Sequence, residues 1–388
     1  MAVTDEQNII AIASSDKEPG VYALYGENQL LLTNINTKES HLIAKLPNLQ
    51  SHGIGDSRFE GKELEITIHY HHPYICVVER FGVNGALVNM VTGHIRELKR
   101  DDYHCDVSSY SVGFLENDGK TLFICQTEWN RLDIFDAESG KNLTEREISR
   151  EDSGDRDEKY GCIIFEDKNY LDYFHSQLHI SPDNNYFLSN GWIWQPYDFL
   201  TLYNVKDFFK IFEPGAIFVD QVFCADGYNW DRPCCFVDDE TFVVILDDAR
   251  YAGNLESDEV ENYEYNQLAF YKIKEEYVKP VSRNDFREII PEKSVKCTAF
   301  NTYAYGEVQG RLYYNKTKGY LVAVTPDGAS AISLSGEILA QIPEAVFRNT
   351  LFNYVDKIII GWDYSPEHHV LYSWKNGIGV VEKRFECQ

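Results

Sequence analysis

Short apolar runs separated by tight polar turns recur along almost the whole chain. The clearest copies read SVGFLENDGKTLFICQTEWNRLDIFDAESGK from Ser111, LHISPDNNYFLSNGWIWQPYDFLTLYNV from Leu178 and LYYNKTKGYLVAVTPDGASAISLSGE from Leu312. Such runs, rich in aromatic and β-branched residues and bounded by Asn, Asp and Gly, are typical of strands joined by hairpin turns. A hairpin cannot bury both faces alone, so hairpins repeated side by side around a circle predict a β-propeller.

The pattern predicts an all-β fold, a seven-bladed β-propeller of four-stranded antiparallel blades. No linker divides the chain, so residues 1–388 are predicted to form a single domain. The blades are expected at Ile9–Leu46, Leu64–Lys99, Tyr110–Ile148, Ser176–Phe212, Pro233–Val281, Gly310–Ile342 and Leu351–Phe385.

The outer strands are the least regular part of this pattern. We expect the fourth strand of the third blade at Asn142–Ile148 and that of the fifth at Tyr277–Val281. The fourth blade ends either in a weak strand near Phe208–Phe212 or in a short helix over Asp207–Phe212. The stretch Asn284–Val308 has room for one extra strand.

Two kinds of connection differ in length. Turns joining the first to the second strand and the third to the fourth are short, as in Glu116–Lys120 and Asp136–Gly140. Connections from the second to the third strand, and from one blade to the next, are longer, as in Gly191–Asp198, Ser149–His175 and Glu213–Asp231. In an antiparallel blade the longer set emerges on one face. Since loops on a rigid scaffold commonly carry function, we expect that face to bind a partner, although long loops are also tolerated as plain insertions.

The turns Ser181-Pro182-Asp183-Asn184-Asn185 and Glu116-Asn117-Asp118-Gly119-Lys120 resemble the hairpin turn of WD40 and YVTN-type propellers, and Thr325-Pro326-Asp327-Gly328 echoes it. No blade ends in the Trp-Asp dipeptide of a WD40 repeat. The chain therefore resembles a divergent member of that broad class. The resemblance implies a propeller that commonly serves as an interaction platform, and it assigns no functional residues.

The composition narrows the choice of partner. The net charge of −26 argues against nucleic acid and anionic membranes, because a phosphate backbone is held mainly by Lys and Arg. No run approaches the roughly 18 apolar residues needed to span a bilayer, and the N-terminus has no signal-peptide pattern. The nine cysteines are scattered and lie mostly within apolar runs, as buried thiols in a reducing compartment would. These features predict a cytoplasmic protein that binds a protein or peptide partner. The negative net charge favours a basic partner.

Tryptophan marks the expected binding face. Five of the six tryptophans fall at the same end of their predicted strands. Trp, Tyr and Arg dominate binding hot spots, because they combine a large apolar area with a polar group. Any one of these rings could instead fill a gap between blades. The predicted binding residues are Trp129, Arg131, His175, Trp192, Trp194, Asp198, Trp230, Asp231, Arg232, Trp362 and Asp363.

Acidic and histidine-rich segments complete the set of candidates. The runs Ser149–Lys159 and Asp247–Tyr265 are expected to be solvated loops or acidic loops at the channel mouth that attract a cation. His69 and His71 share a strand face, but sequence supplies no third ligand, so no metal site or cofactor is predicted. Asp172, His175 and Ser176 lie close together in sequence, and a strand-capping role is favoured over a catalytic one.

Two functional hypotheses remain. The first is a non-enzymatic interaction protein that presents a Trp-rich, acidic loop face to a protein or peptide. The second is a hydrolase or lyase acting on a small metabolite or sugar at the mouth of the central channel, where a divalent metal could assist. The sequence contains no Gly-x-Ser-x-Gly nucleophile motif and no phosphate-binding loop, which favours the first hypothesis.

Overall fold

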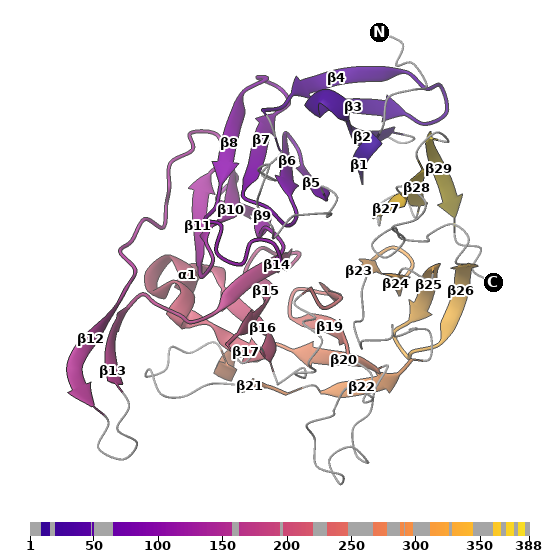
Figure 1. Cartoon of the computed structure of the whole chain (residues 1–388). Helices are drawn as coiled ribbons and strands as arrows, with labels where there is room; N and C mark the ends of the chain where they lie inside the picture. Colours follow the sequence, from indigo (N-terminus) through magenta and orange to yellow (C-terminus); the bar gives the residue numbers. More distant parts are fainter. Residues whose placement is uncertain are drawn as a thin grey trace.

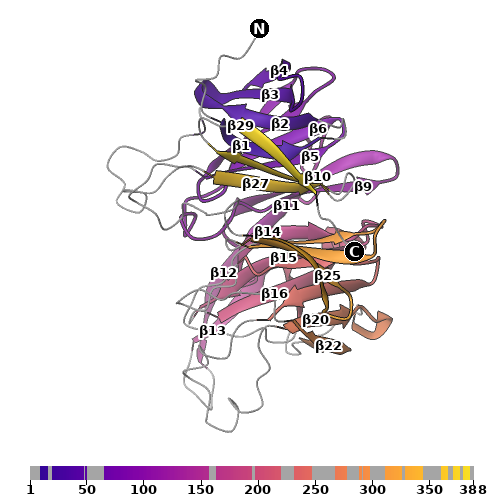
Figure 2. The same cartoon turned by 90° about the vertical axis from the view of Figure 1, so that its right-hand side faces the viewer.

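The fold consists almost entirely of antiparallel sheets arranged around a circle (Figure 1). The computed structural model describes residues 9–15, 20–47, 49, 65–156, 163–194, 197–219, 231–246, 267–277, 288–290, 292–297, 311–325, 328–343, 360–365, 370–375 and 379–384. Within these residues there are eight sheets, which we name A to H in chain order. Figure 2, turned by 90°, shows strands of different sheets running in roughly the same direction.

The first three sheets each follow the chain without interruption. Sheet A contains β1 (Ile9–Ser14), β2 (Gly20–Tyr25), β3 (Gln29–Asn34) and β4 (Ser40–Lys45). Sheet B contains β5 (Ile66–His71), β6 (Tyr74–Glu79), β7 (Asn84–Asn89) and β8 (Ile95–Lys99). Sheet C contains β9 (Val112–Asn117), β10 (Lys120–Glu128) and β11 (Arg131–Asp136).

A two-stranded hairpin, sheet D, follows sheet C and comprises β12 (Ser149–Arg156) and β13 (Ile163–Lys168). Sheet E contains β14 (Phe174–Ile180), β15 (Tyr186–Ile193), β16 (Tyr197–Asn204), β17 (Ile217–Val219) and β21 (Glu288–Ile289). Sheet F contains β18 (Cys234–Phe236), β19 (Thr241–Ile245), β20 (Gln267–Lys272) and β22 (Lys293–Lys296). In Figure 1 the hairpin projects away from the circle.

The last two sheets lie at the C-terminal end. Sheet G contains β23 (Arg311–Asn315), β24 (Tyr320–Thr325), β25 (Gly328–Ser333) and β26 (Ile338–Pro343). Sheet H contains β27 (Ile360–Ser365), β28 (Val370–Lys375) and β29 (Gly379–Arg384). The described helices are short: α1 (Val205–Ile211), η1 (Gly26–Asn28), η2 (Glu213–Gly215) and η4 (Glu275–Tyr277). None of them is long and apolar enough to cross a membrane.

The second strand of a sheet packs against both neighbouring sheets. In β6, Ile75 and Val77 pack against sheet A, whereas Cys76 and Val78 pack against sheet C. Successive side chains of a strand point to opposite faces, so a continuous apolar run is what burial on both faces requires. Each fully buried aliphatic side chain contributes roughly 1.5–3 kcal/mol.

Apolar clusters of this kind join neighbouring sheets all the way around the circle. Clusters link A to B, B to C, C to E, E to F, F to G and G to H. A seventh cluster joins sheet H back to sheet A, where Val370 of β28 packs with Ile9 and Ala23. The first and last sheets therefore meet through side chains, and in the described part of the chain β1 pairs within sheet A. This arrangement is an all-β, β-propeller-like fold.

The outer edge of sheet C departs from the prediction. No strand forms over Asn142–Ile148; only an isolated bridge joins Phe135 to Asn142. Buried side chains satisfy the edge of β11 instead: Leu132 N donates to Glu213 Oε1 (2.8 Å) and Ile134 N donates to Thr144 Oγ1 (2.8 Å).

An ion pair holds this edge in place. Arg146 bonds Glu213 and also donates to Asp133 Oδ1 (2.9 Å). The side chains of Arg146 and Asp133 are each 2% exposed, and that of Glu213 is fully buried. A side chain from the segment between β16 and β17 thus completes the edge of sheet C, where the sequence predicted a fourth strand that does not form.

Other outer strands also differ from the prediction. The segment near Phe208–Phe212 lies in helix α1 and its end, as the helical alternative predicted, and Asn204 caps the helix by accepting from Asp207 N (3.1 Å). The fifth blade was expected to end in a strand at Tyr277–Val281; Tyr277 lies in η4, and residues 278–281 lie outside the described residues. In the described part of the chain, β22 forms the outer strand of sheet F. The acidic run Ser149–Lys159 was expected to be a loop, whereas its described part forms β12.

Candidate functional site

Six aromatic side chains meet on the face where the longer connections emerge. Tyr103 and His104 lie between β8 and β9, Trp129 lies between β10 and β11, and Phe174 begins β14. The other two rings are those of Trp192, near the end of β15, and Trp194, just after it. We call the set Tyr103, His104, Trp129, Phe174, Trp192 and Trp194 the aromatic cluster.

The base of the aromatic cluster is a buried stack. The Phe174 and Trp192 rings are parallel within 7°, with centroids 3.7 Å apart. Trp129 lies 4.2 Å from Phe174, and His104 meets Trp192 edge-on at 5.4 Å. Trp192 is 2% exposed, and its Nε1 donates to Ser108 Oγ (3.1 Å). Stacked and edge-to-face rings each add about 0.5–1.5 kcal/mol beyond their buried area, so this base is rigid.

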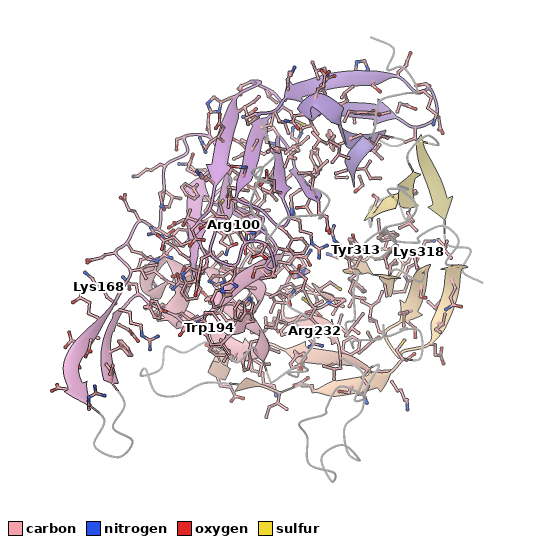
Figure 3. All side chains as sticks on the ribbon, in the orientation of Figure 1. Arg100, Lys168, Trp194, Arg232, Tyr313 and Lys318 are labelled. Atoms are coloured by element: carbon pink, nitrogen blue, oxygen red, sulfur yellow. The ribbon has the colours of Figure 1, made fainter. Side chains whose placement is uncertain are left out.

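The top of the aromatic cluster faces solvent. Tyr103 is 46% exposed and Trp194 is 45% exposed, and their ring centroids lie 6.4 Å apart. Figure 3 labels Trp194 on the left-hand side of the circle, the same side as Arg100. Large exposed rings fixed on a buried base are typical of interaction sites.

Carboxylates border these rings. Asp102 is exposed, Glu128 has a half-exposed side chain, and Asp101 is partly buried. Burial raises the pKa of Asp101 to about 6, against the lowering effect of the Trp129 backbone N–H. Arg131 adds no free positive charge, because its guanidinium pairs with Asp133 (2.8 Å) and Glu128 (3.6 Å). The border of the aromatic cluster is therefore lined with carboxylates.

A buried arginine fixes the loop that carries Tyr103 and His104. Arg100 is 3% exposed, and its Nη2 donates to the carbonyls of Cys105 (3.0 Å) and Ser108 (2.8 Å). Its Nε donates to Gly82 O (2.6 Å), and its Nη1 donates to Gln126 Oε1 (2.7 Å). One guanidinium thus ties the loop to sheets B and C, and it holds the exposed rings in a defined position.

Asp231 is the centre of a second polar group. Its carboxylate accepts from Arg80 Nη2 (3.2 Å), Ser176 Oγ (2.6 Å) and Gln177 N (3.2 Å), and it is also bonded by Ser109 Oγ. Burial acts to raise its pKa, but Arg80 and the other donors stabilise the carboxylate, and the pKa lies below its usual value. With these donors in place, Asp231 holds neighbouring sheets together.

His175 lies inside the protein. Its side chain is fully buried, with Nδ1 2.9 Å from Ser189 Oγ. Burial and the nearby Arg146 lower the pKa of His175 to about 3, so the ring is neutral at physiological pH. The sequence grouped His175 with Asp172 and Ser176, but Ser176 bonds Asp231 and Asp172 pairs with Arg150 (3.2 Å). The structure does not bring these three together as a triad.

The remaining predicted residues are dispersed. Arg232 is 2% exposed, and its carbonyl accepts from Asn190 Nδ2 (3.1 Å). Trp230 lies outside the described residues, and of Asp198 only the backbone is placed, paired with Trp192. Trp362 and Asp363, expected in a loop, lie within β27 opposite Ser373 and Tyr372. That expectation was wrong because β27 continues to Ser365, two residues past Asp363.

Sequence reasoning missed half of the aromatic cluster. Tyr103, His104 and Phe174 were not selected, although Tyr103 and His104 stand in a predicted connection between blades. No group of three or more His, Cys, Asp or Glu side chains in the described part of the chain is arranged to hold a metal ion. His71, from the candidate histidine pair, bonds Glu116 Oε1 (2.7 Å).

Comparison with known proteins yields a fold and no family. No protein-family model matches the chain, and no curated protein matches it in sequence. The structure is similar to Kuenenia stuttgartiensis hydrazine synthase, with a TM-score of 0.54 and 11% identity over 99% of this chain and 97% of that one. A catalytically inactive virginiamycin B lyase from Staphylococcus aureus with quinupristin gives a TM-score of 0.49 and 10% identity over 98% and 97% of the two chains. At such identities a likeness speaks for the fold alone.

Proposed function

We propose that this chain is a seven-bladed β-propeller of the WD40/YVTN-like class, forming one domain over residues 1–388. Sheets A, B, C, E, F, G and H are the blades, and hairpin D is an insertion between the third and fourth. The support is the cycle of apolar clusters, which joins each of these sheets to the next and sheet H to sheet A.

On this scaffold, the protein is a non-enzymatic interaction module. Its aromatic cluster and the acidic border receive a basic side chain of a protein or peptide partner. The observation that carries the proposal is the pair of half-exposed rings, Tyr103 and Trp194, on a buried stack with Asp102 and Glu128 beside them. A Lys or Arg side chain over an aromatic face is worth about 0.5–2 kcal/mol, and neighbouring carboxylates add to the attraction.

The polar residues nearby support binding over catalysis. A catalytic base must reach the proton it removes. His175 is enclosed by the protein, and the Asp231 carboxylate is already shared among Arg80, Ser109, Ser176 and Gln177. The alternative of a hydrolase or lyase at the channel mouth would need other residues to act on its substrate.

We place the protein in the cytoplasm. The described cysteines Cys76, Cys105, Cys125, Cys234, Cys235 and Cys297 are all buried. Burial raises the pKa of the Cys76, Cys125, Cys234 and Cys235 thiols. Such thiols pack as small apolar groups and suit a reducing compartment.

A peptide library panned against the purified protein tests the proposal. We expect the enriched peptides to share Lys or Arg, and the Trp194→Ala and Tyr103→Ala variants to bind them about tenfold more weakly, since roughly 1.4 kcal/mol corresponds to tenfold. Val91→Ala is the matched control, because Val91 is 74% exposed and lies in the turn between β7 and β8, away from the aromatic cluster.

Two results would contradict the proposal. One is enrichment of peptides that lack basic residues, and the other is equal binding by Trp194→Ala and the unmodified protein. A thermal-shift screen of sugars, small metabolites and divalent ions runs in parallel. Stabilisation by one of these, with no peptide binding, would support the hydrolase or lyase alternative, because a ligand of the folded state raises the melting temperature.

A further inference from the structure

Hairpin D stands apart from the other sheets of the described structure. Among the described residues, β12 and β13 form a two-stranded sheet, so each strand has one unpaired edge. Figure 1 shows the hairpin extending outward from the circle, and Figure 3 labels Lys168 at its inner end. A lone two-stranded hairpin is marginally stable in water, and an open edge is a template for another strand.

The two edges are not equivalent. The β12–β13 register shifts between Asp152 and Arg156, and Gly154 has a φ of +81°. Such a bulge bends its strand and blunts the edge against pairing. The register along β13 is unshifted from Phe165 to Lys168. The edge of β13 is therefore the one that can pair with a further strand.

The two faces of the hairpin differ in chemistry. Ile163 and Phe165 lie two residues apart on one face and are 40% and 41% exposed. On the other face Glu166 stands directly opposite Glu151, and both are exposed. Like charges directly opposite each other destabilise a sheet, and a neighbouring cation would relieve them. A strand that alternates apolar and basic residues would complement both faces.

The hairpin lies next to the aromatic cluster. The Arg150 guanidinium lies 4.3 Å from the Phe165 ring centre and 5.1 Å from that of Tyr170. Tyr170 in turn meets Trp129 edge-on at 6.3 Å. A partner bound at the aromatic cluster can therefore continue along the hairpin.

We propose that β13 accepts an extended basic segment of a partner protein as a third strand. The segment pairs with the free edge of β13 and places apolar side chains beside Ile163 and Phe165 and basic side chains beside Glu166. The inference rests on the proposed binding function and extends its surface. A second copy of this chain fits poorly, because each copy carries a net charge of −26 and would bring like-charged hairpins together.

Hydrogen–deuterium exchange of the full-length protein tests the proposal with a defined probe. The probe is a peptide of about eight residues, a common strand length, that alternates lysine and valine. We expect slower exchange over Ile163–Lys168 when it is added. A peptide that alternates glutamate and valine should give no such protection. The lysine peptide with alternate backbone nitrogens methylated should also give none, because strand pairing needs free N–H groups.

Matched variants locate the contact. Glu166→Lys should weaken binding of the lysine peptide about tenfold, since it replaces an attraction by a repulsion across the strand pair. Glu145→Lys makes the same charge change at an exposed position outside the hairpin strands and should have little effect. Trp194→Ala should leave the protection of Ile163–Lys168 in place.

Three results would overturn the proposal: no protection by the lysine peptide, equal protection by the methylated peptide, or unchanged binding by Glu166→Lys. Sedimentation provides a fourth. A concentration-dependent dimer with a protected hairpin in the absence of peptide would make a second copy the occupant. Failure at the hairpin leaves the peptide-panning result at Trp194 standing, so the two proposals fail separately.

Discussion

Replacing Asp231 by alanine should loosen the junction of four sheets. Asp231 precedes β18 of sheet F, and its carboxylate is bonded by Arg80 after β6, Ser109 before β9, and Ser176 and Gln177 of β14. The Asp231→Ala variant removes all of these bonds at once and leaves the donors of sheets B, C and E without their shared acceptor.

The loss of stability in Asp231→Ala depends on how deeply the carboxylate is buried and on which partners Arg80 keeps. Breaking a buried, hydrogen-bonded ion pair costs about 3–5 kcal/mol. The Asp231 side chain is 14% exposed, and Arg80 keeps its ion pair with Glu65 (3.0 Å), so we expect the lower end, about 3 kcal/mol. Unfolding entropy is about 2.1 cal/mol/K per residue, which for 388 residues converts this loss into a fall of roughly 4 °C in the melting temperature.

The assay is thermal unfolding followed by circular dichroism, repeated from neutral to acidic pH. The pKa of Asp231 is lower in the folded protein than in the unfolded chain. The contribution of Asp231 to stability is therefore present above its pKa in the unfolded chain, about 3.9, and is lost as the pH falls toward its pKa in the folded protein. The difference between the two proteins should be largest near neutral pH and should shrink in acid.

Asp239→Ala is the control, because Asp239 is an exposed aspartate in the turn after β18. Surface substitutions of this kind usually stay within about 0.5 kcal/mol. The reasoning is refuted if Asp231→Ala melts within about 1 °C of the unmodified protein, or if their difference does not change with pH.

Two further predictions concern buried charge. Burial lowers the pKa of His175 to about 3, so this residue should reduce the free energy of unfolding by about 1.4 kcal/mol for each pH unit below about 6.5. The His175→Asn variant should therefore take up about one proton fewer on unfolding in that range. Urea unfolding at several pH values measures this difference. Glu213→Ala should lower the free energy of unfolding by about 3 kcal/mol, because Arg146 and Leu132 N lose this carboxylate while Arg146 keeps Asp133. Glu145→Ala, at an exposed position, should change it little, and equal urea midpoints for the two variants would contradict the role of Glu213 at the edge of sheet C.

Local pattern was sufficient for the inner three strands of most sheets. The predicted first blade, Ile9–Leu46, contains β1 to β4, and the predicted second blade, Leu64–Lys99, contains β5 to β8. These strands are buried on both faces or on one, so their apolar runs have a period that sequence displays directly.

The outer edges depend on contacts that sequence does not display. β21 has two residues and pairs in parallel with β17, although sheet F's first three strands lie between them in the chain. β12, SREDSGDR, has no apolar alternation and is a strand because β13 pairs with it. Two-residue strands and charged strands carry no periodic signal.

Only part of the aromatic cluster was predicted, because the rest depends on contacts that the sequence does not display. Trp129, Trp192 and Trp194 were selected by residue type and loop position, and they do lie together. Their meeting with Tyr103 depends on the bonds from Arg100 to Cys105 and Ser108, which fix the path of that loop. The sequence did not single out Arg100, because its burial follows from the assembled sheets.

The shared edges also set an order for biosynthesis. The backbone N–H of Leu132 in β11 bonds Glu213, which lies 81 residues later in the chain. Arg80 pairs with Asp231, which lies 151 residues later. Neither bond can form before the later residue has been made. β17 gains its outer neighbour only when Glu288 and Ile289 have been made. A ring whose blades each closed on themselves could be assembled blade by blade as it left the ribosome. In this chain sheets B, C and E stay incomplete until residues well beyond them have been made, so truncation before β21 should also leave sheet E without its outer strand, although the other four strands of that sheet would be present.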